Sequence, residues 1–392
     1  MTIKLSDRVQ RVKPSPTLAV TARAAELKAA GQDIIGLGAG EPDFDTPQHI
    51  KDAAIEAIHQ GKTKYTAVDG TASLKLAVIN KFKRDNGLDY TPEQILVSCG
   101  GKQSFYNLAQ ALLNEGDEVI IPAPYWVSYP DMVLLADATP VIINTDIRQN
   151  FKITPEQLDV AITPKTRLFV INSPSNPSGM AYSAAELKAL ATVLKKYPDV
   201  LIATDDMYEH ILWSDESFSN IVMTNPELYD RTIVLNGVSK AYSMTGWRIG
   251  YCGGPTQLIK AMKKIQSQST SNPTSIAQAA AEAALNGDQS CVAVMLKAFK
   301  QRHDMVVGSL NEIEGVHCIK GDGTFYVFAD FTGFMQRYAH INNDIELAEF
   351  IIDKTGVALV PGSAFGNEGY MRLSFATSEA NLTEAIRRIA AL

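Results

Sequence analysis

The sequence has few cysteines and lacks a long apolar run. Its 392 residues include four cysteines that form no C-x-x-C pair, so neither a zinc site nor a disulfide framework is indicated. No run approaches the roughly 18 apolar residues of a membrane span, and residues 1–10 lack the apolar core of a signal peptide. We therefore expect reduced thiols, a cytoplasmic location and no membrane partner.

Basic charge is also in short supply. The chain has 36 Lys and Arg against 43 Asp and Glu, a net charge of −7, whereas nucleic-acid surfaces need clustered cations. The six histidines are scattered without the spacing of metal ligands. No nucleic-acid partner and no metal site are expected.

Two nucleotide-binding motifs are missing as well. Residues 36–42, GLGAGEP, spell G-x-G-x-G, and Pro42 then blocks the helix that the dinucleotide fingerprint requires. The GKT at 61–63 lacks the earlier glycine of a P-loop, because Glu56 stands at that position. Neither hydride transfer nor ATP chemistry is indicated.

Short β-branched runs alternate with helical patterns through the middle of the chain. Strand-like runs lie at 94–99, 118–122, 140–144, 167–172, 199–206, 232–236 and 248–254, and helical patterns lie at 49–61, 71–87, 102–116, 126–137 and 183–197. This alternation is typical of an α/β fold whose mostly parallel sheet is covered on both faces. We expect a large domain at 47–299.

The two ends of the chain differ from the middle. A helix is expected near 15–30, a long helix near 288–312, strands at 316–320, 325–330, 357–362 and 371–376, and a last helix at 379–392. We expect residues 1–46 and 300–392 to form a small α+β domain. Two or three domains also agree with a prior of about 150 residues per domain.

Polar residues follow four of the predicted strands. Because ligands bind beyond the carboxyl ends of the strands in open α/β sheets, these residues predict one site. A desolvated lysine forms Schiff bases with carbonyl compounds. Pyridoxal 5'-phosphate needs such a lysine, a carboxylate for its ring nitrogen, a donor for its ring oxygen and an anion cradle for its phosphate. The four strand ends supply this set: Gly100, Gly101 and Lys102; Asn176; Asp205 and Tyr208; and Lys240.

Motifs along nearly the whole chain fit one family. The segment 237–250 has the pattern G-x-S-K followed by small residues and R-I-G. It occurs together with AGEPDFDTP at 39–47, YTAVDG at 65–70, NSPSNPSG at 172–179, DDMYEH at 205–210 and MRLSFATS at 371–378. The chain therefore resembles the class I aminotransferases of the aspartate aminotransferase family, which have fold type I. GGKQ at 100–103 beside PYWVSYP at 124–130 points to the subgroup of aspartate and aspartate/prephenate aminotransferases.

The resemblance implies three catalytic residues. Lys240 would form the Schiff base with pyridoxal phosphate and then move a proton between the substrate and the cofactor. Asp205 would pair with the pyridine nitrogen, although an aspartate after a strand is also typical of a helix N-cap. Tyr208 would donate to the ring oxygen, and we assign no role to the neighbouring Asp206.

The resemblance also implies the rest of the cofactor site. Gly100, Gly101 and Lys102 would cradle the phosphate at a helix N-terminus, Arg248 would add a charged fork, and Trp126 would stack on the ring. Tyr65 resembles a tyrosine that reaches the phosphate of the neighbouring subunit, which implies a homodimer with active sites at the subunit interface. Many relatives carry Ser where this chain has Gly237, so one phosphate contact is in doubt.

Substrate contacts follow from the same resemblance. Arg372 would take the α-carboxylate with help from Asn176 and the backbone of Gly40, and Trp126 would lie beside the substrate. The segment 266–278, where one branch of the family has an arginine that serves the neighbouring subunit, contains no Arg or Lys. We expect Lys102 to bind the distal carboxylate instead.

The expected function is therefore transfer of the amino group of L-aspartate to 2-oxoglutarate. Lys13 matches a lysine that the subgroup associates with prephenate, so prephenate is a plausible second acceptor. Two alternatives stay open at this point. They are a pyridoxal-phosphate-dependent β-elimination lyase, and an aminotransferase of aromatic or alanine specificity.

Overall fold

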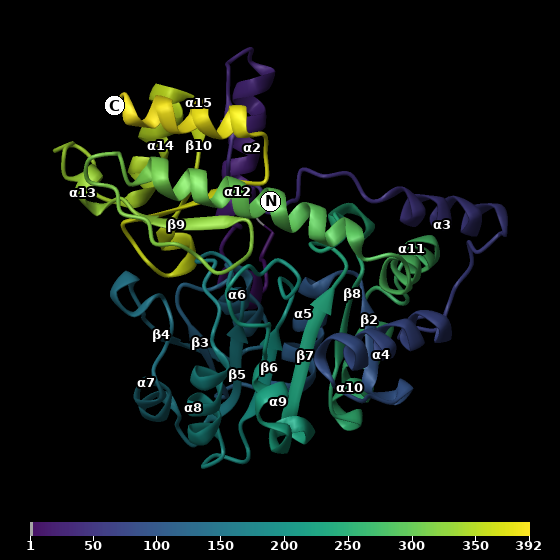
Figure 1. Cartoon of the computed structure of the whole chain (residues 1–392). Helices are drawn as coiled ribbons and strands as arrows, with labels where there is room; N and C mark the ends of the chain where they lie inside the picture. The colour runs from purple at the N-terminus through teal and green to yellow at the C-terminus, as the bar shows by residue number, and fades with distance from the viewer. Residues whose placement is uncertain (1–2) are drawn as a thin grey trace.

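The computed structural model describes residues 3–392 and is built around a seven-stranded sheet (Figure 1). The strand order is β2-β8-β7-β6-β5-β3-β4, with β8 antiparallel to both neighbours and the other pairs parallel. The strands are β2 (Ile95–Ser98), β3 (Glu118–Pro122), β4 (Thr139–Ile143), β5 (Thr166–Asn172), β6 (Leu201–Asp205), β7 (Thr232–Gly237) and β8 (Gly250–Gly253). The mostly parallel α/β sheet expected from the sequence is confirmed.

Helices cover both faces of the sheet. Along β5, Leu168 and Val170 pack under α5 (Gly101–Leu112), α6 (Ser128–Leu135) and α10 (Thr256–Ser267), while Phe169 packs under α8 (Ala184–Leu194) on the opposite face. Burial on both faces explains why these strands read as continuous apolar runs. The other helices of this domain are α3 (Gln48–His59), α4 (Ala72–Asn86), α7 (Pro155–Ala161), α9 (Ile221–Thr224) and α11 (Ser275–Asn286).

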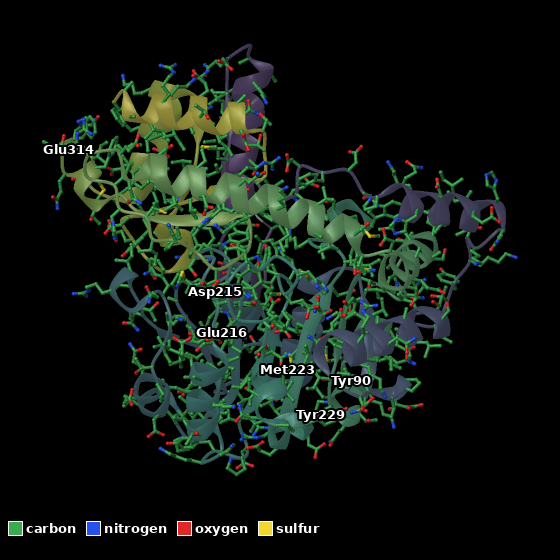
Figure 2. All side chains as sticks on the ribbon, in the orientation of Figure 1. Tyr90, Asp215, Glu216, Met223, Tyr229 and Glu314 are labelled. Carbon is green, nitrogen blue, oxygen red and sulfur yellow. The ribbon has the colours of Figure 1, made fainter. Side chains whose placement is uncertain are left out.

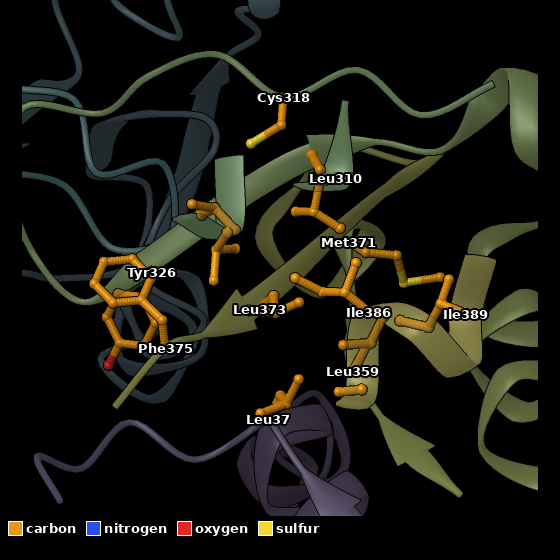
Figure 3. Close-up of a cluster of buried hydrophobic side chains, with 14 of the residues drawn as sticks. Leu37, Leu310, Cys318, Tyr326, Leu359, Met371, Leu373, Phe375, Ile386 and Ile389 are labelled. Carbon is orange, nitrogen blue, oxygen red and sulfur yellow. The ribbon is translucent and has the colours of Figure 1, made fainter. Parts of the chain in front are cut away.

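The small domain lies on the carboxyl ends of the strands, above the sheet in Figure 1. Its antiparallel sheet contains β9 (Tyr326–Asp330), β11 (Val360–Pro361) and β12 (Tyr370–Ser374), and β1 (Ile35–Gly36) pairs in parallel with β10 (Val357–Ala358). Its helices are α1 (Asp7–Gln10), α2 (Pro16–Ala29), α12 (Ser290–Leu310), α13 (Thr332–Met335), α14 (Asp344–Thr355) and α15 (Glu379–Ala390). Figure 3 shows its core, where Leu373 of β12 lies near Ile386 of α15.

Two expectations for the small domain are wrong. Residues 316–320 form no strand and make only one bridge, between His317 and Asp330, because the Asn311 side chain takes both the N–H and the carbonyl of Cys318. The run at 357–362 is two short strands, since β10 pairs with β1 and β11 with β12. The domain boundary at 299/300 stays a prediction, and that position lies within α12, which is one continuous helix.

All four cysteines are free thiols, and Cys252 and Cys318 are buried.

At the end of the sheet far from the small domain, the rings of Tyr90 and Tyr229 stack with centroids 5.3 Å apart (Figure 2). No helix within residues 3–392 combines the length and apolar character needed to cross a membrane.

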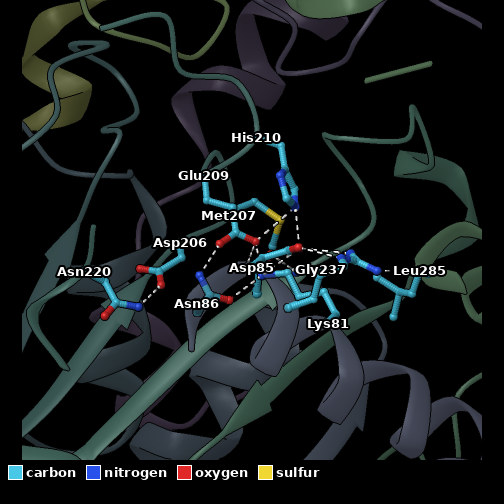
Figure 4. A network of polar contacts seen from close by, with 12 residues as sticks. Lys81, Asp85, Asn86, Asp206, Met207, Glu209, His210, Asn220, Gly237 and Leu285 are labelled. Atoms are coloured by element: carbon cyan, nitrogen blue, oxygen red, sulfur yellow. Dashed lines mark hydrogen bonds and ion pairs between the residues drawn. The ribbon is translucent and has the colours of Figure 1, made fainter. Parts of the chain in front are cut away.

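A buried ion pair ties α4 to the segment that follows β6 (Figure 4). The Lys81 side chain is fully buried, and its ammonium contacts the carboxylate of Glu209, which is 3% exposed. Asn236, near the end of β7, donates to Glu209 Oε1 at 2.9 Å. Burial alone would raise the pKa of Glu209, but the charges of Lys81 and His210 lower it to about 2. The ion pair therefore connects α4 with the strand ends that precede Tyr208 and Lys240.

This network also contains the one group of possible metal ligands found among residues 3–392, which is Asp85, Glu209 and His210. Because Lys81 already balances the Glu209 charge, the observed contacts form an ion-pair network.

Removing one partner of this pair should destabilise the fold. We expect Lys81→Met to lower the free energy of unfolding by about 3 kcal/mol, because Glu209 is left buried without its cation. Lys83→Met on the same helix removes only a surface pair with Asp89, in which both side chains are more than two-thirds exposed, and should change it by less than about 1 kcal/mol. Urea unfolding of both variants tests this, and equal effects would contradict the buried-pair interpretation.

Candidate functional site

A cavity of about 550 Å³ lies between the carboxyl ends of the strands and the small domain. It contains residues from both domains, including Lys240 after β7 and Arg372 on β12. Ten of the predicted site residues line it: Gly40, Gly101, Lys102, Trp126, Asn176, Asp205, Tyr208, Lys240, Arg248 and Arg372. The structure thus brings together residues that are far apart in the sequence.

The start of α5 forms an anion cradle. Gly101 and Lys102 are its first residues, and their N–H groups have no hydrogen-bond acceptor among residues 3–392. Gly100 caps the helix at φ 91°, and a Cβ there would lie 2.3 Å from Arg248 Nη2, so only glycine fits. The N–H of Gly100 donates to the Ser98 carbonyl at 2.8 Å. Two bare amides at a helix N-terminus beside a guanidinium suit a phosphate dianion.

Gly237 has a local explanation. A Cβ at this position would lie 3.1 Å from both the Ile249 carbonyl oxygen and Met207 Cε, and a Cβ on Gly101 would lie 2.6 Å from the same methyl. Met207 therefore fills the space beside the cradle, and a side chain on Gly237 would meet it.

Asp205 is the last residue of β6, and its carboxylate is held from two sides. The Tyr129 hydroxyl donates to one oxygen, and the Met207 N–H donates to the other at 3.2 Å. Burial raises the pKa of Asp205, and these two hydrogen bonds oppose the rise. A fixed, buried carboxylate is the group that a protonated pyridine nitrogen needs.

Tyr208 meets a second tyrosine across the domain boundary. Its hydroxyl lies 3.1 Å from the hydroxyl of Tyr326 on β9. Burial raises the pKa of both tyrosines, so both stay neutral at physiological pH. A Cβ on Gly40 would lie 2.7 Å from the Tyr326 hydroxyl, which explains a glycine at position 40.

Arg372 is 2% exposed and has no carboxylate partner among residues 3–392. It donates to Asn176 Oδ1 at 3.0 Å and to the Gly38 carbonyl at 2.6 Å, and its guanidinium lies 4.4 Å from the centre of the Tyr326 ring. Its Nε is buried without any acceptor. A buried cation without an anion is costly, so this arrangement fits an external carboxylate.

Lys240 carries a perturbed amine. Its Nζ donates to the Gly40 carbonyl at 2.5 Å. Burial, assisted by the charges of Arg372 and Arg248, lowers the pKa of Lys240 to about 8, although Glu41 and Asp205 oppose this. A substantial neutral fraction near physiological pH suits a nucleophile and a general base.

A further cation lines the same cavity. Lys102 Nζ lies 5.4 Å from the centre of the Trp126 ring. Burial and the charge of Arg248 lower its pKa, and it forms no ion pair among the described residues.

Comparison with known proteins decides the family. The family described as aminotransferase class I and II matches residues 32–389. The chain belongs to this aminotransferase family.

Known proteins are closely similar to this chain over its full length. A Nitrosomonas europaea protein named aspartate/prephenate aminotransferase is 64% identical over 100% of both chains, and one from Cereibacter sphaeroides with the same name is 57% identical over 99% of this chain and 98% of the relative. Among solved structures, the aspartate aminotransferase of Rhizobium meliloti superimposes with a TM-score of 0.95 at 49% identity, over 100% of this chain and 98% of the other. That of Thermus thermophilus with maleate gives 0.93 at 43%, over 100% of both.

Three predicted site residues do not line the cavity, and the first, Gly100, caps α5 directly before the cavity residue Gly101. Lys13 lines a neighbouring cavity of about 580 Å³ with Arg11 and Asp131, because the chain before α2 runs beside α6. Tyr65 is 91% exposed in the loop after α3. Within a single subunit, Lys13 therefore does not contact the central cavity, and Tyr65 points to solvent.

Two tyrosines that contact predicted site residues were not themselves predicted. Tyr129 lies three residues after Trp126 within PYWVSYP, and this helical spacing was a usable signal. Tyr326 lies on β9 among other aromatic residues, and nothing in its local pattern separates it from a core side chain.

The amine of Lys240 should titrate unusually early. In the cofactor-free aminotransferase, we expect acylation of Lys240 by acetic anhydride to rise with pH around a midpoint near 8, because its neutral form reacts. Exposed Lys64 is the internal control for the general reactivity of amines in the protein. Peptide mass spectrometry measures acylation of both lysines, and acylation of Lys240 that does not rise around pH 8 would contradict the electrostatic account.

Proposed function

We propose that this aminotransferase uses pyridoxal 5'-phosphate to move the amino group of L-aspartate to 2-oxoglutarate, giving oxaloacetate and L-glutamate, in the cytoplasm. The observation that supports this most is a cavity lined by Lys240 and by two cations, Lys102 and Arg372, that form no ion pair among residues 3–392. A dicarboxylic substrate has two carboxylates to match them. The names of the relatives support the same pair of substrates.

The cavity fits the cofactor group by group. The Gly101 and Lys102 amides and Arg248 would hold the phosphate, Asp205 the ring nitrogen, and Tyr208 with Asn176 the ring oxygen. Trp126 would cover one face of the ring, and the Lys240 amine would bond to the aldehyde carbon. When bound, the cofactor supplies an electron-withdrawing ring that makes the α-hydrogen of the amino acid acidic.

Proton transfer then falls to this chain's own residues. Lys240, with a pKa of about 8, would accept the α-proton of the amino acid at Nζ and donate it again later in the amino transfer. Asp205 would keep the ring nitrogen protonated through its fixed carboxylate. The adjacent Tyr208 and Tyr326 hydroxyls would stay neutral and serve as donors.

Substrate selection rests on charge. Arg372 would take the α-carboxylate through its fork while Asn176 steadies it at 3.0 Å. Lys102 would take the distal carboxylate, and the maleate of the Thermus thermophilus structure is a dicarboxylate of similar size. Prephenate also carries two carboxylates and is proposed as a second acceptor on the names of the relatives.

We further propose a homodimer with shared active sites. Ile55 and Ile58 on α3 are about half exposed, and Tyr65 in the loop that follows is 91% exposed. An exposed apolar face of this kind favours burial against a second subunit. Tyr65 would then reach the phosphate held by the partner.

One assay tests the reaction class. The purified protein with pyridoxal phosphate should form glutamate from aspartate and 2-oxoglutarate in equal amounts with oxaloacetate, and should form none without the keto acid. Release of pyruvate and ammonia from cystathionine without an acceptor would instead indicate the β-elimination lyase. Faster turnover of alanine or aromatic amino acids than of aspartate would overturn the substrate assignment.

Lys102→Ala should lose dicarboxylic substrates selectively. We expect kcat/KM for aspartate to fall about 100-fold, because one charge-assisted hydrogen bond is lost. The same ratio for alanine, which has no distal carboxylate, should change less than about threefold because the backbone amide at position 102 remains. Steady-state kinetics on both amino acids measures the two ratios. Equal losses of kcat/KM for aspartate and alanine would contradict this role of Lys102.

Mixing two inactive variants tests the shared site. Lys240→Ala lacks the amine, and Tyr65→Ala should bind the cofactor weakly in both subunits. If Tyr65 serves the partner, a mixed dimer regains one intact site, and activity should recover to about one quarter of wild type after random exchange of subunits. No recovery, with subunit exchange confirmed by mass, would contradict the contact.

A further inference from the structure

Gln266 is a fully buried amide in a position that its helix would otherwise fill with an apolar residue. It lies on α10, seven residues after Ile259 and four after Met262, and all three face inward with 2% exposure or less. This spacing continues one helix face. A carboxamide at the end of an apolar stripe is costly to bury unless every polar atom is satisfied.

All the hydrogen-bonding capacity of Gln266 is used. Its Oε1 accepts from Ser98 Oγ and from Asn107 Nδ2, both at 2.9 Å. Its Nε2 donates to the carbonyls of Val68 at 2.7 Å and Val97 at 2.8 Å. Two donors and two acceptor sites are the full set for a glutamine.

The partners of Gln266 surround the phosphate cradle. Val97 and Ser98 are the last residues of β2, and only Cys99 separates them from Gly100. Asn107 lies on α5, whose first turn forms the cradle. The fourth partner, Val68, belongs to the loop 62–70 that carries Tyr65. The Val97 N–H also donates to the Asp69 carbonyl at 3.1 Å, so strand, helix and loop meet at one side chain.

We infer that Gln266 is a positioning residue for the phosphate group: it fixes the start of α5 relative to the end of β2 so that the Gly101 and Lys102 amides and Arg248 converge on one anion. This inference rests on the proposed function. Gln266 does not line the cavity, so it acts only through the residues that it holds. Replacing Gln266 should therefore weaken binding of the cofactor's phosphate and leave binding of its aldehyde unchanged.

Comparing pyridoxal 5'-phosphate with pyridoxal tests this dependence, because pyridoxal has the same aldehyde and ring but no phosphate. We expect Gln266→Met to weaken binding of pyridoxal 5'-phosphate to the cofactor-free protein about 10- to 100-fold, and binding of pyridoxal less than about threefold. Inorganic phosphate should compete about tenfold less well in this variant. Absorbance titration measures all three affinities.

Asn225→Leu is the matched control, since Asn225 is buried and its side-chain amide, among residues 3–392, bonds only to Ile221 and Thr224 near α9. It should lower the melting temperature without changing the ratio of the two affinities. If Gln266→Met proves insoluble, Ser98→Ala removes one of the four hydrogen bonds and should shift the ratio about threefold to tenfold in the same direction.

The outcomes separate the two claims. If wild type binds neither aldehyde through Lys240, the proposed function fails. If wild type binds both and Gln266→Met, or Ser98→Ala in its place, keeps the wild-type ratio, the proposed function stands and the positioning role of Gln266 is wrong.

Discussion

An excess of positive charge in one cavity is the constraint on which this site depends. Four cationic side chains line the cavity, Lys102, Lys240, Arg248 and Arg372, against two carboxylates, Glu41 and Asp205. The chain as a whole carries a net charge of −7, so this concentration of cations is local. Charges of one sign in a cleft with low-dielectric walls attract ligands of the opposite sign. Burial, together with the charges of Arg372 and Arg248, lowers the pKa of Lys240 and thereby keeps part of its amine neutral.

The fold makes this arrangement possible by delivering the cations from separate elements. Lys102 comes from α5, Lys240 and Arg248 from the connection between β7 and β8, and Arg372 from β12 of the small domain. Behind them, two buried polar centres hold the strand ends, one at Glu209 and one at Gln266. Such centres are stable only when fully paired.

Much of the fold could be predicted from the sequence because two local patterns indicate it. The β-branched runs separated by helical patterns predict the parallel sheet, and the polar residues after them, such as Asp205 and Lys240, converge because parallel strands end at one edge. The gathering of ten predicted site residues in one cavity follows from that rule and from the resemblance to the family.

The remaining features depend on tertiary contacts that no local pattern encodes. Tyr326 becomes part of the site only because β9 faces Tyr208 across the domain boundary. The segment 316–320 has the composition of a strand, yet Asn311 satisfies its backbone instead. Lys13 lies beside a different cavity because the chain before α2 follows α6. The position of Lys13 in the sequence does not reveal this path of the chain.

The most direct test of the central claim is the identity of the amine that bonds the cofactor. The purified protein is saturated with pyridoxal 5'-phosphate, reduced with borohydride and mapped by peptide mass spectrometry. The account predicts the reduced pyridoxyl label on Lys240 alone, and loss of the label in the presence of saturating aspartate. A label on Lys102 or on a surface lysine, or no label at all, would contradict it.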